Sequence, residues 1–446
     1  MIDLVIIGAG PGGFDTAIYA AEHGLETVLI EKHIVGGTCL NVGCIPTKTL
    51  YQNAKTIKNM KELSTLGIKV DNFAIDYEQI KTRKEEIVEN QVGNILNSLK
   101  KLGVTLIQGE AQILTKNTVM VNDEVIEAKN IIIATGSVPK VFPFKGIDLD
   151  IVNDSAGILS LETFPKKMII VGAGVIGCEI ATIFNYFDCE ITLVEYAKEI
   201  LPPLDKDVKK RARNLYKRQG LKIYTSSTLD ELKEVDGKYF ASLTVKGKEL
   251  IVETDYVLLA TGRSPAFGNL DLKGLGIEYS DSGINVNDNF ETSVEGVYAI
   301  GDVTGILMLA HKATYDGYKV VSTILNKQMD INFDLVPSVV FSFPEIAIIG
   351  KTEQELEGTE YTTNKYLYKT NAKAAAMNET DGFIKMIIDQ DRILIGCHII
   401  GAHAADIIHE VSGLMYKNIS IDEYKNIIHA HPTLSEIVGE CIKGFE

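Results

Sequence analysis

Residues 4–31 read LVIIGAGPGGFDTAIYAAEHGLETVLIE, and residues 168–195 read MIIVGAGVIGCEIATIFNYFDCEITLVE. Each stretch predicts an apolar strand, a G-x-G-x-x-G turn, a helix of small residues and a second apolar strand that ends in a carboxylate. Two copies indicate two dinucleotide sites, or one site beside a decayed relic, rather than two structural turns. The repeated residues, offset by 164 positions, are Gly8, Gly10, Gly13 and Glu31 in the first copy and Gly172, Gly174, Gly177 and Glu195 in the second.

Each repeated position has a physical reason in a dinucleotide site. The first glycine permits a tight turn, the second lets the backbone approach a pyrophosphate, and the third lets helix and strand pack closely. The N-terminus of the helix offers free N–H groups and a partial positive charge to the phosphates. The carboxylate accepts hydrogen bonds from ribose hydroxyls. One such motif is a weak indication because glycine-rich turns are common, whereas two matched copies are a strong one.

A second repeated motif follows each of these two fingerprints. Residues 131–139 read IIIATGSVP and residues 256–265 read YVLLATGRSP, so each is an apolar strand that ends in Ala-Thr-Gly. We expect these strands to close the two nucleotide-binding units, with Gly136 and Gly262 beside the cofactors. On their own, the motifs would be interpreted as ordinary turns that follow two strands.

The cysteines indicate redox chemistry. Six cysteines in 446 residues are too few for a secreted disulfide scaffold, and only Cys39 and Cys44 lie close in sequence. Within residues 36–48, GGTCLNVGCIPTK, Pro46 predicts the first position of a helix, whose dipole would stabilise a thiolate at Cys44. This favours a redox pair over two packing residues, and over a zinc site, for which further ligands are lacking nearby; no metal is expected. The remaining cysteines are expected to be packing residues: Cys178, Cys189, Cys397 and Cys441.

Residues 429–436 read HAHPTLSE and place a base near a carboxylate. Dithiol oxidation needs a base, histidine titrates near neutrality, and a carboxylate on its far nitrogen fixes the tautomer. We therefore expect His431 and Glu436 to act as a pair, although an isolated histidine there would be interpreted as a capping or packing residue. His429 and His311 are interpreted in that structural way.

Composition and charge narrow the classes of function. The chain carries 44 basic and 60 acidic side chains, a net charge of −16 that disfavours nucleic acid and anionic membranes as partners. No apolar run approaches the roughly 20 residues that span a bilayer. The first residues, MIDLVIIGAG, lack the cationic region of a signal peptide, so we expect a cytoplasmic protein.

The C-terminal part of the sequence has a different pattern. Residues 336–400 contain several β-branched runs that predict an antiparallel sheet, and helical patterns follow from about Ala404. We therefore expect an α/β chain with two Rossmann-like dinucleotide-binding domains followed by a C-terminal α+β domain.

Together these motifs resemble those of the class I flavin-dependent pyridine nucleotide-disulfide oxidoreductases, and of their lipoamide dehydrogenase branch in particular. They occur in the family's order and cover nearly the whole chain: VIIGAGPGG, GGTCLNVGCIPTK, VGAGVIGCE, ATGR, YAIGDVTGILMLAHKA, TDGFIKMII and HAHPTLSE. The resemblance implies an FAD-binding domain over residues 1–143 and 264–335, an NAD-binding domain over 144–263 and an interface (dimerisation) domain over 336–446.

The resemblance also implies roles for the site residues. The first fingerprint would bind the ADP half of FAD, and the second would bind NAD. Asp302 would hold the ribityl or pyrophosphate portion of FAD. Cys39 would be the thiol that meets the substrate, and Cys44 the thiol next to the flavin. Lys48, paired with Glu179, would lie beside the flavin and the nicotinamide.

The implied assembly is a homodimer in which His431 and Glu436 reach the disulfide of the other subunit. The implied reaction is oxidation of protein-bound dihydrolipoyl groups to the lipoyl disulfide, with reduction of NAD to NADH, through a Cys39–Cys44 redox disulfide. A separate lipoylated carrier protein of a 2-oxo acid dehydrogenase, acetoin or glycine cleavage complex would present the substrate. Glu195 favours NAD because a carboxylate there repels the 2′-phosphate of NADP.

Two other functions stay open. The nearer one is an NAD(P)H-dependent reductase of another small disulfide, and the more distant one is a non-catalytic flavoprotein component of a complex. The chain also departs from many relatives of this family. Phe341 replaces a tyrosine, Ala266 replaces an asparagine, and Lys373 and Ala375 lie where an arginine is common.

Overall fold

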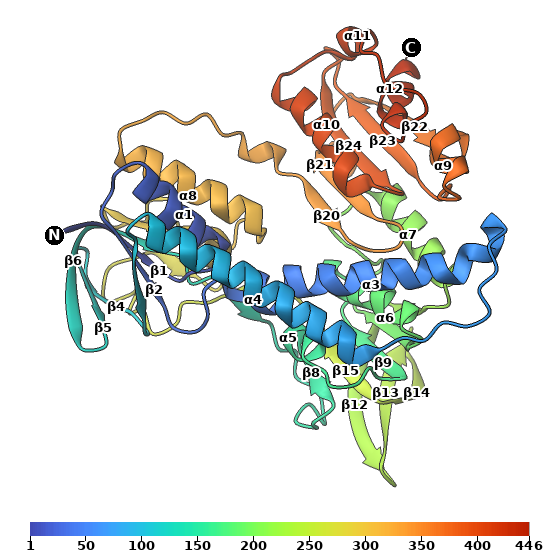
Figure 1. Cartoon of the computed structure of the whole chain (residues 1–446), viewed down its shortest axis with the longest axis horizontal. Coiled ribbons are helices and arrows are strands. Elements are labelled where there is room, and N and C mark those ends of the chain that lie inside the picture. The colour runs from blue at the N-terminus through green and yellow to red at the C-terminus, as the bar shows by residue number, and fades with distance from the viewer. Residues whose placement is uncertain (446) are drawn as a thin grey trace.

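The computed structural model describes residues 1–445, and its first nucleotide-binding unit is a sheet in the order β3-β2-β1-β6-β5-β4 (Figure 1). Strands β3, β2, β1 and β6 run parallel. Strand β19 also pairs in parallel with β6, at residues 131–133, which pair with β1 on the other side. The two remaining strands, β4 and β5, form an antiparallel extension. The strands are β1 (Ile2–Ile7), β2 (Thr27–Glu31), β3 (Thr105–Gln108), β4 (Gln112–Thr115), β5 (Thr118–Val121), β6 (Glu124–Ile133) and β19 (Val297–Ala299).

The helix of the first fingerprint forms where the sequence predicts it. It begins at Pro11 after the N-cap residue Gly10, a place where the missing N–H of proline breaks no intrahelical bond. Gly12 lets this helix approach α8, because a Cβ atom at Gly12 would lie only 3.1 Å from the Cβ of Ala313. The helices of this unit are α1 (Pro11–Glu22), α2 (Gly37–Val42), α3 (Cys44–Glu62), η1 (Leu63–Leu66), α4 (Tyr77–Lys101), η2 (Gly301–Thr304) and α8 (Ala310–Ile324).

The second fingerprint folds into its own parallel sheet, in the order β11-β10-β9-β15-β8. An antiparallel sheet of β12, β13 and β14 extends from it, at the bottom of Figure 1. The strands are β8 (Val152–Asn153), β9 (Lys167–Val171), β10 (Glu190–Glu195), β11 (Lys222–Thr225), β12 (Ser227–Val235), β13 (Lys238–Val245), β14 (Lys248–Thr254) and β15 (Tyr256–Leu259). The helices are α5 (Ser155–Leu159), α6 (Val175–Tyr186) and α7 (Lys206–Arg218).

The two Ala-Thr-Gly motifs meet where the units join. Strand β7 (Ser137–Pro139) follows the first motif and pairs antiparallel with β16 (Arg263–Pro265), which follows the second. The N–H of Lys140 also donates to the carbonyl of Gly262 at 2.9 Å. A short hairpin of β17 (Tyr279–Ser280) and β18 (Gly283–Ile284) comes after this junction.

The C-terminal unit is an antiparallel sheet in the order β20-β21-β24-β23-β22, and α10 begins at Ala404. Both observations confirm the prediction from the sequence. The strands are β20 (Ser338–Val340), β21 (Ile346–Gly350), β22 (Thr362–Leu367), β23 (Phe383–Ile388) and β24 (Leu394–Ile400). The helices are η3 (Phe333–Leu335), η4 (Tyr368–Thr370), α9 (Ala372–Ala376), α10 (Ala404–Tyr416), α11 (Ile421–Tyr424) and α12 (Glu436–Lys443).

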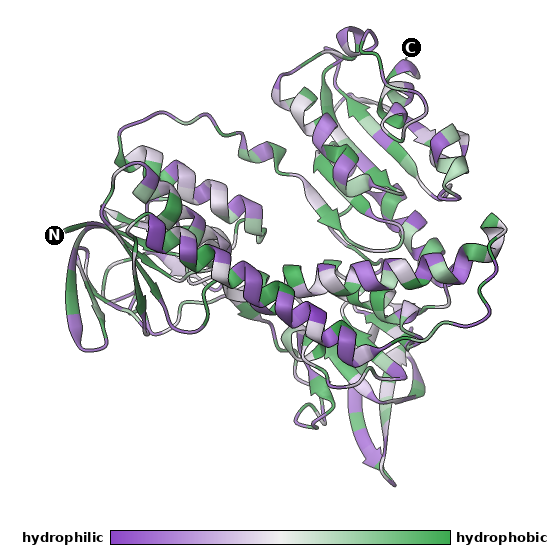
Figure 2. Cartoon of the chain, in the orientation of Figure 1, coloured by the Kyte–Doolittle hydropathy of each residue, from purple (hydrophilic) through white to green (hydrophobic). Residues whose placement is uncertain are grey.

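Apolar residues concentrate along the strands of all three units (Figure 2). In β1, Leu4 and Ile6 belong to the core on one face of the sheet, while Val5 and Ile7 belong to the core on the other. A run that is apolar at every position is typical of a parallel sheet covered on both faces. Across residues 1–445, no helix has both the length and the apolar character needed to cross a membrane.

Candidate active site

The carboxylates of the two fingerprints hold their glycine turns in the same way. Glu31 accepts a hydrogen bond from the N–H of Ala9 at 2.7 Å, and Glu195 accepts one from the N–H of Ala173 at 2.6 Å. The other oxygen of each glutamate accepts from the N–H two residues further along, at 2.8 and 2.7 Å. The repeat seen in the sequence is therefore also a repeat of hydrogen-bond geometry.

The glycines leave room for a dinucleotide. Gly8 has φ +103°, and a Cβ atom at Gly13 would lie 1.8 Å from the carbonyl oxygen of Gly8, so neither position accepts a side chain. A Cβ atom at Gly10 would meet no heavy atom within 4 Å, so this residue faces open space at the start of α1. Such a turn fits a pyrophosphate at the helix N-terminus. The same geometry recurs at Gly172, Gly177 and Gly174.

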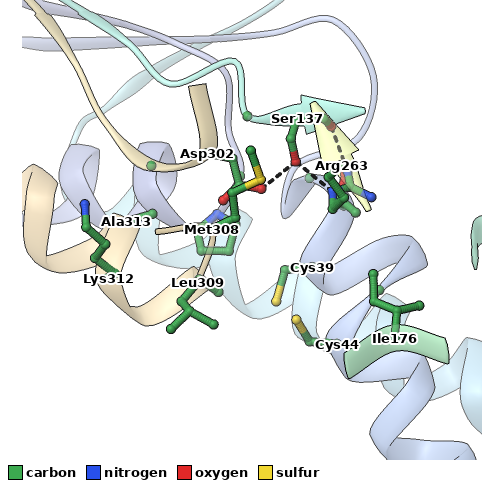
Figure 3. A pocket seen from close by; sticks show the side chains of 18 of the residues that line it. Cys39, Cys44, Ser137, Ile176, Arg263, Asp302, Met308, Leu309, Lys312 and Ala313 are labelled. Atoms are coloured by element: carbon green, nitrogen blue, oxygen red, sulfur yellow. Dashed lines mark hydrogen bonds between the residues drawn. The ribbon is translucent and has the colours of Figure 1, made fainter. Parts of the chain in front are cut away.

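Both turns open into one cavity of about 2470 Å³, which Cys39 and Cys44 also line. In Figure 3, Cys39 and Cys44 lie beside each other, and Ile176 and Leu309 are among the apolar residues that line the same cavity. The predicted site residues on its walls are Gly8, Gly10, Glu31, Cys39, Cys44, Lys48, Gly136, Gly172, Gly174, Glu179, Glu195, Gly262 and Asp302. Gly13 and Gly177 lie behind the turns, where they allow helix and strand to pack.

The two cysteines lie on consecutive short segments. Cys39 belongs to α2, and Cys44 is the first residue of α3, with Gly43 between the two helices. The prediction that Pro46 is the first helical residue is therefore wrong, because α3 begins two residues earlier. Proline fits the third position because N–H groups in the first turn have no intrahelical acceptor. Both thiols are free and partly exposed.

Cys44 is the more acidic of the two thiols. A hydrogen bond from Cys39 and the charge of Lys48 lower the pKa of Cys44 to about 7, although burial and the Glu179 carboxylate raise it. The same hydrogen bond, together with burial, raises the pKa of Cys39. Cys44 therefore carries the thiolate of the pair near neutral pH, and Cys39 keeps its proton.

Lys48 is held at one wall of the cavity by a buried carboxylate. Its Nζ donates to the two oxygens of Glu179 at 2.9 and 3.1 Å, and Glu179 is 4% exposed. The backbone N–H of Phe341 donates to the same carboxylate at 2.8 Å, and the Phe341 ring lies under the ammonium at 4.8 Å. These contacts fix the ammonium about one helical turn from Cys44.

Asp302 is held by Ser137, which Arg263 holds in turn, and sequence reasoning missed both residues. The Ser137 hydroxyl donates to Asp302 Oδ2, and Arg263 donates to Ser137 Oγ and to the Ser137 carbonyl, both at 2.7 Å (Figure 3). Ser137 and Arg263 directly follow the two Ala-Thr-Gly motifs. That shared position could have singled them out.

His431 and Glu436 form the predicted contact, but at a distance from the cavity. His431 Nδ1 lies 2.9 Å from Glu436 Oε1, and the N–H of Thr433 donates to Glu436 Oε2 at 2.7 Å. The Thr433 N–H and then the histidine lower the pKa of Glu436. His431 is 72% exposed and neither residue lines the cavity, so the described residues of one chain do not bring this pair to the cysteines.

His429 and His311 both lie within hydrogen-bond distance of other groups of the chain, and the four remaining cysteines are packing residues. His429 contacts Glu410 at 2.9 Å and the hydroxyl of Tyr424 at 3.0 Å. His311 lines the cavity, and its Nε2 lies 2.9 Å from the carbonyl of Pro337. The remaining cysteines are all buried in the cores: Cys178, Cys189, Cys397 and Cys441.

A cluster of three carboxylates outside the cavity has the spacing of metal ligands, but a lysine fills it. The acids are Asp205, Asp207 and Glu353. The fully buried Lys385 donates to both oxygens of Asp205 at 2.9 Å, to Asp207 at 2.7 Å and to Glu353. This cluster joins the start of α7 to the C-terminal sheet as a buried ion network.

Comparisons with known proteins identify the family of this chain. The family described as pyridine nucleotide-disulphide oxidoreductase matches residues 2–317, and its dimerisation domain matches residues 336–442. The dihydrolipoyl dehydrogenase of Bacillus subtilis is 37% identical over 98% of this chain and 95% of its own length. The mitochondrial dihydrolipoyl dehydrogenase of Pisum sativum is also 37% identical, over 98% and 90% of the two chains.

Solved structures show the same fold. The HOCl-induced flavoprotein disulfide reductase RclA from Escherichia coli is 26% identical, with a TM-score of 0.89 over the whole of both chains. LpdA from Mycobacterium tuberculosis superposes with a TM-score of 0.91 over 99% of both chains, and at 24% identity it supports the fold alone. The chain belongs to the pyridine nucleotide-disulphide oxidoreductase family, whose enzymes use FAD and NAD and dimerise through the C-terminal domain.

Proposed function

We propose that this protein is a dihydrolipoyl dehydrogenase, which oxidises protein-bound dihydrolipoyl groups and reduces NAD. The observation that carries the proposal is the acidic thiol of Cys44, which is hydrogen-bonded to the thiol of Cys39 inside a cavity that both nucleotide fingerprints line. This arrangement supports transfer of an electron pair between a dithiol and a nicotinamide. The relatives that cover 98% of the chain at 37% identity carry the name dihydrolipoyl dehydrogenase, which favours a lipoyl dithiol as the substrate.

The first half of the reaction is a thiol–disulfide exchange. The partner subunit's His431, oriented by its Glu436, takes a proton from the substrate dithiol at Nε2. The substrate thiolate attacks Sγ of Cys39, the Cys39–Cys44 bond breaks, and Cys44 leaves as a thiolate. The helix N-terminus and Lys48 stabilise that thiolate. The second substrate thiol then displaces Cys39 as a thiol, which completes the lipoyl disulfide.

The second half needs both nucleotides. FAD bound at the first fingerprint would supply two-electron chemistry between the dithiol and NAD. The protein positions charged side chains at the site. Glu179 holds the ammonium of Lys48 at the cavity wall between the two units. Ile176, which lies within the second fingerprint, contributes an apolar side chain to the cavity wall (Figure 3).

The proposal includes the assembly and the carrier. Two subunits are needed because the base pair lies away from the cavity of its own chain. We place the dihydrolipoyl group on a separate lipoylated carrier protein of a 2-oxo acid dehydrogenase, acetoin or glycine cleavage complex. Its flexible arm would deliver the dithiol to Cys39. The free, buried cysteines favour a reducing compartment, and we propose the cytoplasm.

The test is reduction of NAD by dihydrolipoamide with purified protein, with NADP in parallel and a Cys39→Ser variant as the control. Turnover with NAD, absent in the variant, supports the proposal. A yellow protein that oxidises NADH with an artificial dye but ignores dihydrolipoamide would be a reductase of another small disulfide. A protein that is inactive in both assays after addition of FAD would favour the non-catalytic component.

A further inference from the structure

Arg263 occupies an unusual place on the cavity wall. It belongs to β16, which directly follows the second unit, yet both of its side-chain hydrogen bonds reach Ser137 next to the first unit. Within residues 1–445, the guanidinium has no carboxylate within 4.0 Å, and no other arginine lines the cavity. Within that part of the chain, Arg263 therefore forms no ion pair that would explain its position. The contacts that remain to explain it are its two hydrogen bonds to Ser137.

Those hydrogen bonds have a fixed direction. A guanidinium can only donate, so Ser137 Oγ accepts from Arg263 Nε. The hydroxyl has one proton, and that proton therefore points away from Arg263, toward Asp302 Oδ2. Without Arg263, the same hydroxyl could rotate and donate elsewhere. The arginine thus determines that the Ser137 hydroxyl donates to Asp302 Oδ2 and so orients the carboxylate at the cavity wall.

The other side of Asp302 is also fixed. The preceding residue, Gly301, donates its N–H to Asp316 at 3.1 Å, and Asp316 is buried in an ion pair with Lys312 at 2.8 Å. The backbone of Asp302 is therefore held by α8, while its side chain is oriented by Ser137. The carboxylate of Asp302 can still rotate, and the hydrogen bond from Ser137 determines its orientation.

We propose that Arg263 is a positioning residue for FAD: acting through Ser137, it orients the Asp302 carboxylate that binds the flavin cofactor. The inference rests on the assignment of Asp302 to FAD and is independent of which dithiol the enzyme oxidises. Its consequence is that the first unit binds its own dinucleotide with help from a side chain on β16, the strand that follows the second unit in the sequence.

A purely structural role for Arg263 predicts something different. Strands β7 and β16 are already paired through their backbones from Ser137 to Pro139, and the Lys140 N–H adds a further bond to Gly262. The junction of the units therefore survives loss of the Arg263 side chain. If the contact between Arg263 and Ser137 only joined the two strands, its loss would lower the stability of the apoprotein and leave its affinity for FAD unchanged.

The experiment is a double-mutant cycle on FAD binding to apoprotein, followed by quenching of flavin fluorescence. Arg263→Met and Ser137→Ala should each raise the dissociation constant for FAD about tenfold, the usual effect of one lost hydrogen bond to a charged group. The double variant should bind FAD no more weakly than either single variant, because both substitutions remove the same interaction with Asp302. Arg263→Lys should recover most of the affinity, because an ammonium also only donates to Ser137.

The matched control is Arg213→Met, which removes an arginine that pairs with Glu199 at 3.0 Å away from Asp302. It should leave FAD affinity unchanged. Urea unfolding of each apoprotein gives the second readout. A hundredfold loss in the double variant would overturn the proposal, because the two residues would then act independently. Wild-type FAD affinity in Arg263→Met, with or without a loss of apoprotein stability, would also overturn it.

Discussion

Lys48 Nζ lies 2.9 Å from Glu179 Oε2, and this ion pair joins helix α3 of the first unit to helix α6 of the second. The two charges act on the Cys44 thiol in opposite directions. The ammonium lowers its pKa and the carboxylate raises it. The pair therefore adjusts the reactivity of Cys44 as well as the contact between the units.

The opposite effects can be separated by substitution. Relative to a Cys39→Ser parent that keeps both charges, Lys48→Met should move the pKa of Cys44 upward, and Glu179→Gln should move it downward. Because the thiolate is the reactive form, the pH midpoint of alkylation by iodoacetamide reports this pKa. The measurement is made in a Cys39→Ser background, in which Cys44 is the one remaining cysteine outside the buried cores of residues 1–445.

Lys55→Met is the control for that experiment. Lys55 lies on the same helix but pairs with Glu345 at 3.7 Å, so its loss should leave the alkylation midpoint in place. Midpoints that move in the same direction for the Lys48 and Glu179 variants would show that the substitutions disturb the site in a general way. The assignment of opposite charge effects would then be wrong.

Hybrid dimers test whether the base comes from the other subunit. His431→Gln alone should slow oxidation of the dithiol about 10²- to 10⁴-fold, the range for a lost acid–base group. Cys39→Ser alone should be inactive. A hybrid of the two chains keeps one complete site if His431 acts across the interface, and none if it acts within its own chain. An equal mixture refolded together should therefore regain roughly one quarter of the wild-type rate.

The matching control mixes His431→Gln with Glu436→Gln chains. Both substitutions then affect the same base pair, so each site of a hybrid still contains one altered pair and no complete site forms. Recovery in this second mixture equal to that in the first would exclude a contribution across the subunits.

The two fingerprint carboxylates should have separate effects. Glu195→Ala should raise the Michaelis constant for NAD about tenfold and leave FAD bound, because one hydrogen-bonding group of the second site is lost. Glu31→Ala, the equivalent change in the first copy, should instead weaken the binding of FAD. Steady-state kinetics with varied NAD and fluorescence titration with FAD check the two effects. An unchanged constant for NAD in Glu195→Ala would contradict the assignment of the second site.

The buried Lys385 should matter for stability. Lys385→Met leaves the buried carboxylate of Asp205 without its partner, which should lower the free energy of unfolding by about 3–5 kcal/mol. Lys365→Met is the control, because Lys365 is 40% exposed and its ion pair with Asp207 should contribute no more than about 1 kcal/mol. Urea denaturation followed by circular dichroism compares the variants. Equal losses for both would show that burial of Lys385 is unimportant.

The same cluster predicts a dependence on acid. Burial raises the pKa of Asp207, but hydrogen bonds from Lys365 and Lys385 outweigh it and lower the pKa to about 2. A carboxylate with a lowered pKa stabilises the fold above its unfolded value, near 3.8, and loses that contribution as the pH falls toward 2. Acid titration of wild-type protein should show this loss, and an Asp207→Asn variant should show less of it.

Much of the fold could be predicted because it depends on local patterns. The two strand–turn–helix–strand units follow from the spacing of Gly8, Gly10 and Gly13 and of their repeats, and the turn geometry leaves little alternative. The helix start at Cys44 could not be predicted exactly, because Pro46 is compatible with more than one position in a first turn. The domain boundaries at residues 143, 263 and 335 stay predictions.

The site could be predicted only in part. Cys39 with Cys44 and His431 with Glu436 are close in sequence, so their contacts follow from local structure. The contact of Ser137 with Arg263 joins residues 126 positions apart and depends on the pairing of β7 with β16. No local pattern determines such a contact. Even so, both residues lie directly after a repeated motif.

The backbone hydrogen bonds of Glu31 and Glu195 have a consequence for cofactor loading. Each carboxylate already closes its turn by accepting two N–H groups of its own unit. The conformational entropy of ordering these turns is therefore lost during folding and not during binding. The apoprotein thus presents preorganised receptor loops, and it should take up, release and exchange its dinucleotides as a rigid host, without induced fit in the fingerprints.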